Sequence, residues 1–269
     1  MSVITTTDIA YYSDGVSLLD LYRDPDHANG AAVIDIHGGG WFRGSKAKDA
    51  DWASRLAAEG YLVVVPEYHD VPAGYYPAPL VDMDHVWQWL RSSDYDFDRA
   101  KIAAVGSSAG GNMSVEMAIK YSIPAVSLSG ILDIDDWLSH HEDVVPAPDN
   151  SQNFGAASSS INQTGGNDAF YKWFIMNYFH DRTDRLTEGT PVHRVSATTG
   201  PVYVANSLNE FVPTSGVLAF TEAMVRSNVP VVAQFLSGTR HAKGYLDDVY
   251  EQTVQFLSHY LLNEGQTES

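Results

Sequence analysis

The sequence has 269 residues, 44% of them hydrophobic and 19% charged, so it has apolar side chains for the core of a large domain and is not globally disordered. Its 34 acidic residues outnumber its 16 basic ones, and the formal net charge of -18 excludes nucleic acid and anionic membrane surfaces as favoured partners. The absence of cysteine excludes disulfides, thiolate metal sites and a cysteine nucleophile.

The start of the sequence carries no basic segment followed by an apolar one, which is the pattern of a signal peptide. No apolar run approaches the roughly 18 residues that a membrane-spanning helix needs. We therefore expect a cytoplasmic protein without a membrane partner.

The first third of the sequence predicts a hairpin followed by alternating strands and helices. Residues 9–12 and 16–22 flank the turn sequence Ser13-Asp14-Gly15, which is typical of an antiparallel hairpin. Short apolar runs predict buried strands, and apolar residues at helical spacing predict helices. The resulting elements are a strand at 31–36, a helix at 49–59, a strand at 61–66 and a helix at 77–91.

Three consecutive glycines follow the buried strand 31–36 directly, in His37-Gly38-Gly39-Gly40-Trp41. Consecutive glycines let backbone N–H groups point at a bound molecule with no side chain between them. We predict that Gly39 and Gly40 donate to an oxyanion, while Gly38 shapes the turn and His37 anchors this loop.

A serine stands at the apex of the next strand, turn and helix, predicted at 101–105 and 109–121. The sequence Gly106-Ser107-Ser108-Ala109-Gly110 matches the Gly-x-Ser-x-Gly nucleophile elbow, in which the glycines flank a serine held in a strained conformation. We predict Ser108 as the nucleophile, because its rival Ser107 lacks symmetric glycine flanks. The N–H of Ala109, at the start of the helix, is the third predicted oxyanion donor.

After a strand at 125–128, residues from about 133 to 190 interrupt the alternation. Residues 149–168 are rich in Ser, Asn, Gly and Gln and predict irregular backbone, whereas residues 169–180 are dense in aromatic side chains. We interpret this segment as an insertion above the sheet. Two readings stay open, a lid that walls an apolar acyl or aryl pocket and a surface excursion packed on its own aromatic rings.

The remainder returns to alternation, with strands at 201–205 and 231–235, a helix at 214–226 and an amphipathic C-terminal helix. Among ten histidines, His241 alone follows the last predicted strand closely, so we predict it as the base that accepts the proton of Ser108. The acid that orients this imidazole should follow the strand 201–205, where Asn209 and Glu210 are adjacent. Together the elements predict an α/β fold, with a mostly parallel sheet covered by helices on both faces, in one domain over 1–269.

These motifs resemble the α/β-hydrolase esterases of the hormone-sensitive-lipase type, and more closely small bacterial carboxylesterases and feruloyl or acetyl esterases. The resemblance covers about residues 31–262 and rests on His-Gly-Gly-Gly-Trp, Gly-Ser-Ser-Ala-Gly-Gly, Tyr-Tyr-Pro-Ala at 75–78 before Asp82, and the terminal histidine. In that family the acid lies in a segment like Asp-x-x-Val-Pro, and Asn209 stands at the aspartate position here. An amide orients an imidazole but does not stabilise an imidazolium, so we predict Glu210 as the acid, with Asn209 as the alternative.

The resemblance implies a serine carboxylesterase that forms an acyl-enzyme, needs no metal or cofactor and takes a small-molecule ester as its partner. The short, aromatic insertion predicts short acyl chains, from acetyl to butyryl, or aryl esters. Two alternatives stay open, an arylformamidase-type amide hydrolase and a hydrolase-fold protein that binds a ligand with weakened catalysis, which Asn209 favours. The sequence leaves open whether the protein forms a homo-oligomer.

Overall fold

We describe residues 2–262 in a computed structural model. An eight-stranded sheet runs through it in the order β1-β2-β4-β3-β5-β6-β7-β8. The strands are β1 (Ile4–Ala10), β2 (Leu18–Arg23), β3 (Ala32–Ile36), β4 (Leu62–Pro66), β5 (Ile102–Ser107), β6 (Ala125–Leu128), β7 (Val202–Ser207) and β8 (Val231–Leu236). β2 is antiparallel to both of its neighbours, and the pairings from β4 through β8 are parallel, which confirms the predicted mostly parallel sheet.

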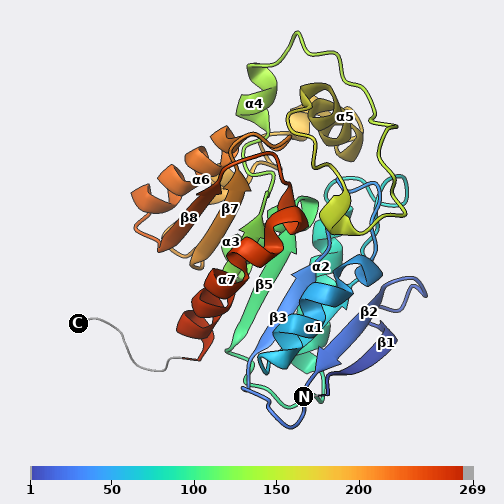
Figure 1. Ribbon diagram of the computed structural model, residues 1–269, viewed down its shortest axis with the longest axis vertical. Coiled ribbons are helices and arrows are strands. Elements are labelled where there is room, and N and C mark those ends of the chain that lie inside the picture. Colours follow the sequence, from blue (N-terminus) through green and yellow to red (C-terminus); the bar gives the residue numbers. More distant parts are fainter. Residues whose placement is uncertain (1, 263–269) are drawn as a thin grey trace.

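Helices cover both faces of this sheet (Figure 1). α1 (Ala50–Ala58) and α7 (Leu246–Leu261) pack on one face, and α2 (Ala78–Ser92), α3 (Ala109–Tyr121) and α6 (Thr214–Arg226) pack on the other. The alternation of side chains along β3 explains the two layers, because Val33 joins the core under α1 and α7 while Ile34 joins the core under α2 and α3. The helices lie where apolar spacing predicted them, with ends that differ by one or two residues.

The hairpin begins earlier than predicted. Its first strand occupies Ile4–Ala10 rather than 9–12, and Thr5 and Thr6 pair with Tyr22 and Leu21 of β2. The prediction was wrong here because β1 is an edge strand whose side chains are almost all exposed, so it lacks the apolar alternation by which strands are recognised. Its pairing rests on backbone hydrogen bonds to β2 instead.

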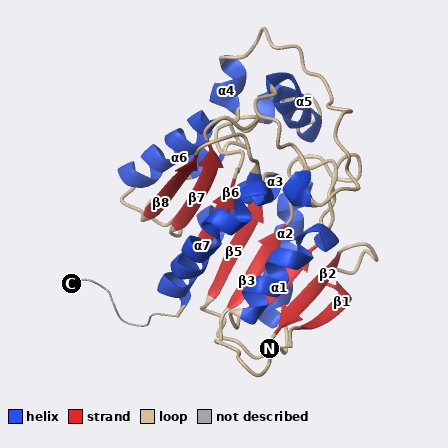
Figure 2. Cartoon of the chain, viewed as in Figure 1, coloured by secondary structure: helices blue, strands red, loops and turns tan. Residues whose placement is uncertain are grey.

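The chain leaves the sheet between β6 and β7 and forms α4 (Asp135–Ser139) and α5 (Asp168–Tyr178) beyond the carboxyl ends of the strands. Figure 2 shows the long irregular loop that joins them, as the composition of 149–168 predicts. α5 begins where the Asn167 side chain accepts a hydrogen bond from Phe170 N–H at 3.2 Å. Its rings join the main core, where Tyr178 stacks on Trp41 at 4.1 Å between centroids, so the aromatics do not pack only on one another.

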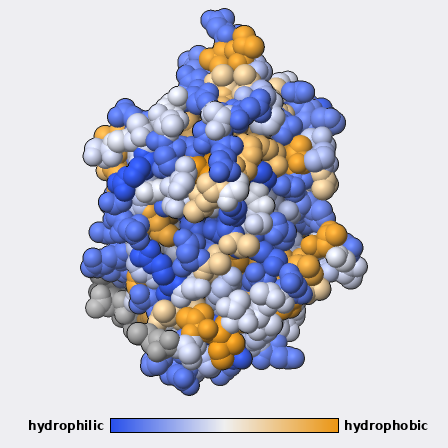
Figure 3. All heavy atoms as spheres, turned by 45° about the vertical axis from the view of Figure 1, so that its right-hand side comes forward, coloured by the Kyte–Doolittle hydropathy of each residue, from blue (hydrophilic) through white to orange (hydrophobic). Residues whose placement is uncertain are grey.

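The surface is polar over most of the face in Figure 3, with apolar residues in small separate groups. Among the exposed large apolar side chains, Val145 lies in the loop after α4, whereas Leu218 and Val225 lie on α6. Within residues 2–262, no helix has the length and apolar character required to cross a membrane.

A buried charged cluster links β3 to the segment that follows β8. Asp35 lies on the same side of β3 as Val33, is fully buried, and has no hydrogen-bond partner for either carboxylate oxygen among the described residues. Lys243, in the short 3-10 turn Ala242–Tyr245, donates to Asp49 at 3.0 Å and to the carbonyl of Lys48 at 2.7 Å. Burial, with the nearby Asp49 carboxylate, raises the pKa of the Asp35 carboxyl well above its usual range, so the fold favours the protonated form of Asp35.

Asp35→Asn should therefore raise the free energy of unfolding at neutral pH. The unfolded chain loses this proton above about pH 4 while the folded chain keeps it to a higher pH, so Asp35 opposes folding increasingly as the pH rises from there. The amide keeps the shape of the side chain and removes that term. Urea unfolding should show the largest gain at neutral pH and a shrinking gain toward about pH 4.

The exposed Asp26 provides a matched control, because Asp26→Asn makes the same change from carboxyl to amide at the surface. Its effect on the free energy of unfolding should stay within about 0.5 kcal/mol. An Asp35→Asn protein that is no more stable than the wild type at neutral pH would contradict the assignment.

Candidate active site

The turn between β5 and α3 holds Ser108 in a strained backbone conformation, with φ 56° and ψ -119°. A Cβ on Gly106 would lie 2.2 Å from the carbonyl oxygen of Gly110, and a Cβ on Gly110 would lie 1.8 Å from the carbonyl oxygen of Ile36. Both glycines are required because α3 begins directly against the end of β3. The predicted nucleophile therefore sits at the carboxyl edge of the sheet, in the turn that its sequence motif predicts.

The glycine loop after β3 lies beside this turn. Gly39 has φ +135°, and a Cβ there would lie 1.8 Å from the carbonyl oxygen of Arg43, so no other residue fits. Among the described residues, the backbone N–H groups of Gly39 and Gly40 donate to no protein acceptor. The N–H of Ala109 has no partner within α3, since it is the first residue of that helix. The three predicted oxyanion donors are thus available to a bound molecule.

His37, at the start of this loop, contacts both Gly38 and Tyr68. Its ring stacks on Tyr68 at 4.2 Å between centroids, and Tyr68 donates a hydrogen bond to the His37 carbonyl at 3.1 Å. Its Nδ1 lies 2.8 Å from the carbonyl oxygen of Gly38. These contacts fit the predicted anchoring role.

His241 follows β8 and contacts Glu210 in the loop after β7. The imidazole Nδ1 lies within hydrogen-bond distance of Glu210 Oε2, and both side chains are buried, with exposed fractions of 5% and 6%. Asn209 is exposed, and its backbone N–H donates to the carbonyl of Gly238 at 3.0 Å. The structure therefore brings Glu210, and not Asn209, to the imidazole.

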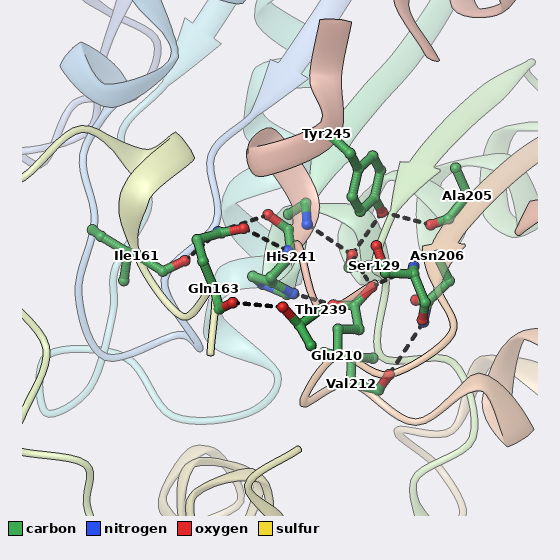
Figure 4. Close-up of polar contacts among 12 residues, drawn as sticks. Ser129, Ile161, Gln163, Ala205, Asn206, Glu210, Val212, Thr239, His241 and Tyr245 are labelled. Atoms are coloured by element: carbon green, nitrogen blue, oxygen red, sulfur yellow. Dashed lines mark hydrogen bonds and ion pairs between the residues drawn. The ribbon is translucent and has the colours of Figure 1, made fainter. Parts of the chain in front are cut away.

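Two hydroxyl groups that the sequence analysis did not identify support Glu210 from its far side (Figure 4). Ser129 Oγ donates to Glu210 Oε1 at 2.7 Å, and the backbone N–H of Ser207 donates to the same oxygen at 2.9 Å. Ser129 Oγ is also 2.6 Å from the hydroxyl of Tyr245, which donates to the carbonyl of Ala205 at 2.8 Å. Burial and the Glu210 charge raise the pKa of Tyr245 well above its usual range, so it remains a neutral hydroxyl.

The insertion holds the backbone of His241. Gln163 accepts a hydrogen bond from His241 N–H at 2.8 Å and donates to the His241 carbonyl at 3.1 Å (Figure 4). The hydroxyl of Thr239 donates to the Gln163 carbonyl at 2.9 Å. Residues 149–168, whose composition predicts irregular backbone, therefore help to hold the backbone of His241 in place. The sequence gives no sign of this contact, which only the structure reveals.

These groups border one cavity of about 140 Å³. Its lining includes the glycines at 38–40, Ser108 and His241, the aromatic residues Phe154, Phe170, Phe174 and Phe211, and the cations Arg43, Lys48 and Lys243. A protein cavity of about 150 Å³ accommodates benzene, so this one has room for a single ring or a short aliphatic chain. Three of the four phenylalanines come from the insertion, which therefore walls the cavity. Within residues 2–262 no group of three or more His, Cys, Asp or Glu side chains could hold a metal ion.

Comparison with known proteins adds to this geometry. The sequence matches the BD-FAE family over residues 19–215. It is 32% identical over 128 residues to esterase LipQ of Mycobacterium tuberculosis, which covers 45% of this chain and 30% of LipQ. It is 28% identical over 252 residues to the probable carboxylic ester hydrolase LipM of the same organism, covering 87% of this chain and 55% of LipM.

The matched segments thus span about a third of LipQ and about half of LipM. A solved structure described as a truncated form of carbohydrate esterase from gut microbiota has a similar fold, with a TM-score of 0.73, 16% sequence identity and 97% of each chain covered. This likeness supports the predicted α/β-hydrolase arrangement of sheet and helices.

Proposed function

The chain belongs to the BD-FAE family and has an α/β-hydrolase fold, and from this premise we propose that it is a serine carboxylesterase acting on small esters. One observation carries the proposal: the imidazole of His241, paired with the Glu210 carboxylate, borders the same cavity as Ser108 in its strained turn. The esterase names of its relatives agree with it.

In this proposal Ser108 Oγ attacks the ester carbonyl while His241 takes the hydroxyl proton through Nε2. The imidazolium that forms is stabilised by the Glu210 carboxylate at Nδ1. The negative charge that develops on the carbonyl oxygen accepts hydrogen bonds from the N–H groups of Gly39, Gly40 and Ala109. His241 then gives its proton to the leaving alcohol, and a water molecule activated by the same base hydrolyses the acyl-enzyme.

The insertion at about 133–190 acts in this proposal as a cap on a single hydrolase domain. Phe154, Phe170 and Phe174 bring aromatic walls to a cavity with room for little more than one ring. We therefore propose acetyl to butyryl esters and aryl esters as substrates, because longer chains would need to displace these rings.

The contact between Glu210 and the imidazole also bears on the two alternatives. A ligand-binding protein with weakened catalysis was favoured by Asn209 alone, and Asn209 is exposed and apart from the imidazole, so this support is lost. An arylformamidase-type amide hydrolase would use the same serine, histidine and glycine loop. Turnover of N-formylaniline against phenyl acetate separates it from the esterase, which should prefer the acetate.

Ser108→Ala should abolish the esterase activity, lowering kcat by about three orders of magnitude or more, because it removes the nucleophile. Labelling by an organophosphate should disappear with it, and circular dichroism should show an unchanged fold. The exposed Ser139 offers a control, since Ser139→Ala should retain full activity and labelling. Mass spectrometry that finds the label on Ser107 or any other serine of the wild type would refute the assignment.

Glu210→Gln should lower kcat by about two to four orders of magnitude, since an amide leaves the imidazolium without a negative partner. Asn209→Ala, at the adjacent position, is the control. It should change kcat little, because the Asn209 side chain is exposed. Thermal unfolding of both variants distinguishes a loss of chemistry from a loss of folding. A Glu210→Gln enzyme with near wild-type turnover would rule out Glu210 as the acid.

Activity should fall as the acyl chain of p-nitrophenyl esters lengthens from butyrate to decanoate. Three of the four aromatic walls of the cavity, Phe170, Phe174 and Phe211, are part of the packed core, so a longer acyl chain requires their displacement. We expect kcat/KM to be highest between acetate and butyrate, measured below the critical micelle concentration of each ester. A higher kcat/KM for decanoate than for acetate would show that the cavity opens more widely than this structure implies.

A further inference from the structure

Arg43 brings a positive charge without an anionic partner to the cavity that contains Ser108. Its guanidinium carbon lies 3.9 Å from the ring centre of Phe154, 4.8 Å from that of Phe42 and 5.5 Å from that of Phe170. Within residues 2–262 no carboxylate is within ion-pair distance of Arg43, and Nη1 is buried without a hydrogen-bond partner. Aromatic rings hold this side chain where most buried arginines have carboxylates.

The other two cations of the cavity differ from Arg43 because each donates hydrogen bonds to protein groups. Lys48 Nζ donates to the carbonyl of Ala156 at 2.6 Å. Lys243 Nζ donates to Asp49 at 3.0 Å. Of these three cations, Arg43 is thus the one that donates no hydrogen bond to the described residues. The nearby Asp149 acts on it only at longer range, and that carboxylate accepts hydrogen bonds from Ser151 and Gln152.

The contacts of Arg43 with aromatic rings do not use its hydrogen-bond donors. Cation–π contacts use the flat faces of a guanidinium, whereas its N–H bonds point outward in the plane, in the fork that matches a carboxylate. Burial lowers the pKa of Arg43 to about 10, so it stays charged at neutral pH.

We propose that this cavity takes esters that carry a carboxylate group, and that Arg43 binds this carboxylate and thereby determines specificity. The inference rests on the proposed esterase function and adds a substrate class to it. A protein with a formal net charge of -18 repels anions at long range, so an anionic substrate needs a local cation of this kind. The carboxylate can belong to the alcohol part or to the acyl part of the ester, and the two give different results in the test.

The test compares kcat/KM for matched charged and neutral esters. 4-Acetoxybenzoate against 4-acetoxybenzamide places the charge on the alcohol part. Mono-4-nitrophenyl terephthalate against 4-nitrophenyl 4-carbamoylbenzoate places it on the acyl part. We expect Arg43→Gln to lower the ratio of charged to neutral kcat/KM about ten- to hundredfold for one pair, and the affected pair identifies the part that carries the carboxylate.

Arg182→Gln is the matched control. Arg182 lies in the insertion, is exposed, and pairs with Asp184 outside the cavity. It should leave both ratios unchanged. Arg43→Lys keeps the charge without the fork and should retain part of the preference. Ratios that are the same in the wild type and in Arg43→Gln for both pairs would overturn the proposal.

Inhibition of the wild type by benzoate and by benzamide provides a measurement that needs no folded variant. The proposal requires stronger competitive inhibition by benzoate, and equal or weaker inhibition by benzoate would overturn it. Results that overturn this proposal can be told apart from results that overturn the proposed esterase function. An enzyme that hydrolyses neutral esters without any dependence on Arg43 remains an esterase, whereas a wild type that hydrolyses no ester removes both proposals.

Discussion

The close approach of the first turn of α3 to the end of β3 is the constraint on which the site depends. Only a glycine at position 110 lets the helix begin against the carbonyl of Ile36, and only this start directs the Ser108 side chain beyond the sheet edge. The same contact brings the glycine loop after β3 beside the helix start. The proposed nucleophile and the proposed oxyanion donors therefore share one steric requirement, and the backbone strain at Ser108 is held by the packing around it.

The base and its carboxylate are held differently, by polar contacts from several elements. Glu210 contacts the imidazole with one oxygen, and its other oxygen accepts from the Ser129 hydroxyl at the end of β6. Tyr245, at the start of α7, completes this arrangement by contacting Ser129 and the end of β7. A buried carboxylate is stable in such a place because each oxygen has hydrogen-bond donors.

The sequence predicts those features of the site that depend on nearby residues of the chain, and it fails where they depend on loop conformation or on distant contacts. Ser108, the glycines and His241 could be predicted because each lies just after a strand, and the carboxyl ends of parallel strands meet at one edge. The sequence favoured Glu210 over Asn209 by its charge alone, since adjacent side chains point in different directions and the loop conformation decides which faces the imidazole. β1 escaped prediction for another reason, because an exposed edge strand has no apolar pattern.

The contacts that the sequence could not reveal at all join residues far apart, and they converge on the insertion. Gln163 holds the backbone of His241, while Phe154 and Phe170 hold Arg43 in the cavity. One segment thus contributes both to the position of the proposed base and to the wall that faces the substrate. Both contributions come from one stretch of backbone, because Gln163 lies between Phe154 and Phe170 in the sequence. In the proposed esterase, specificity and the geometry of catalysis therefore depend on the same segment.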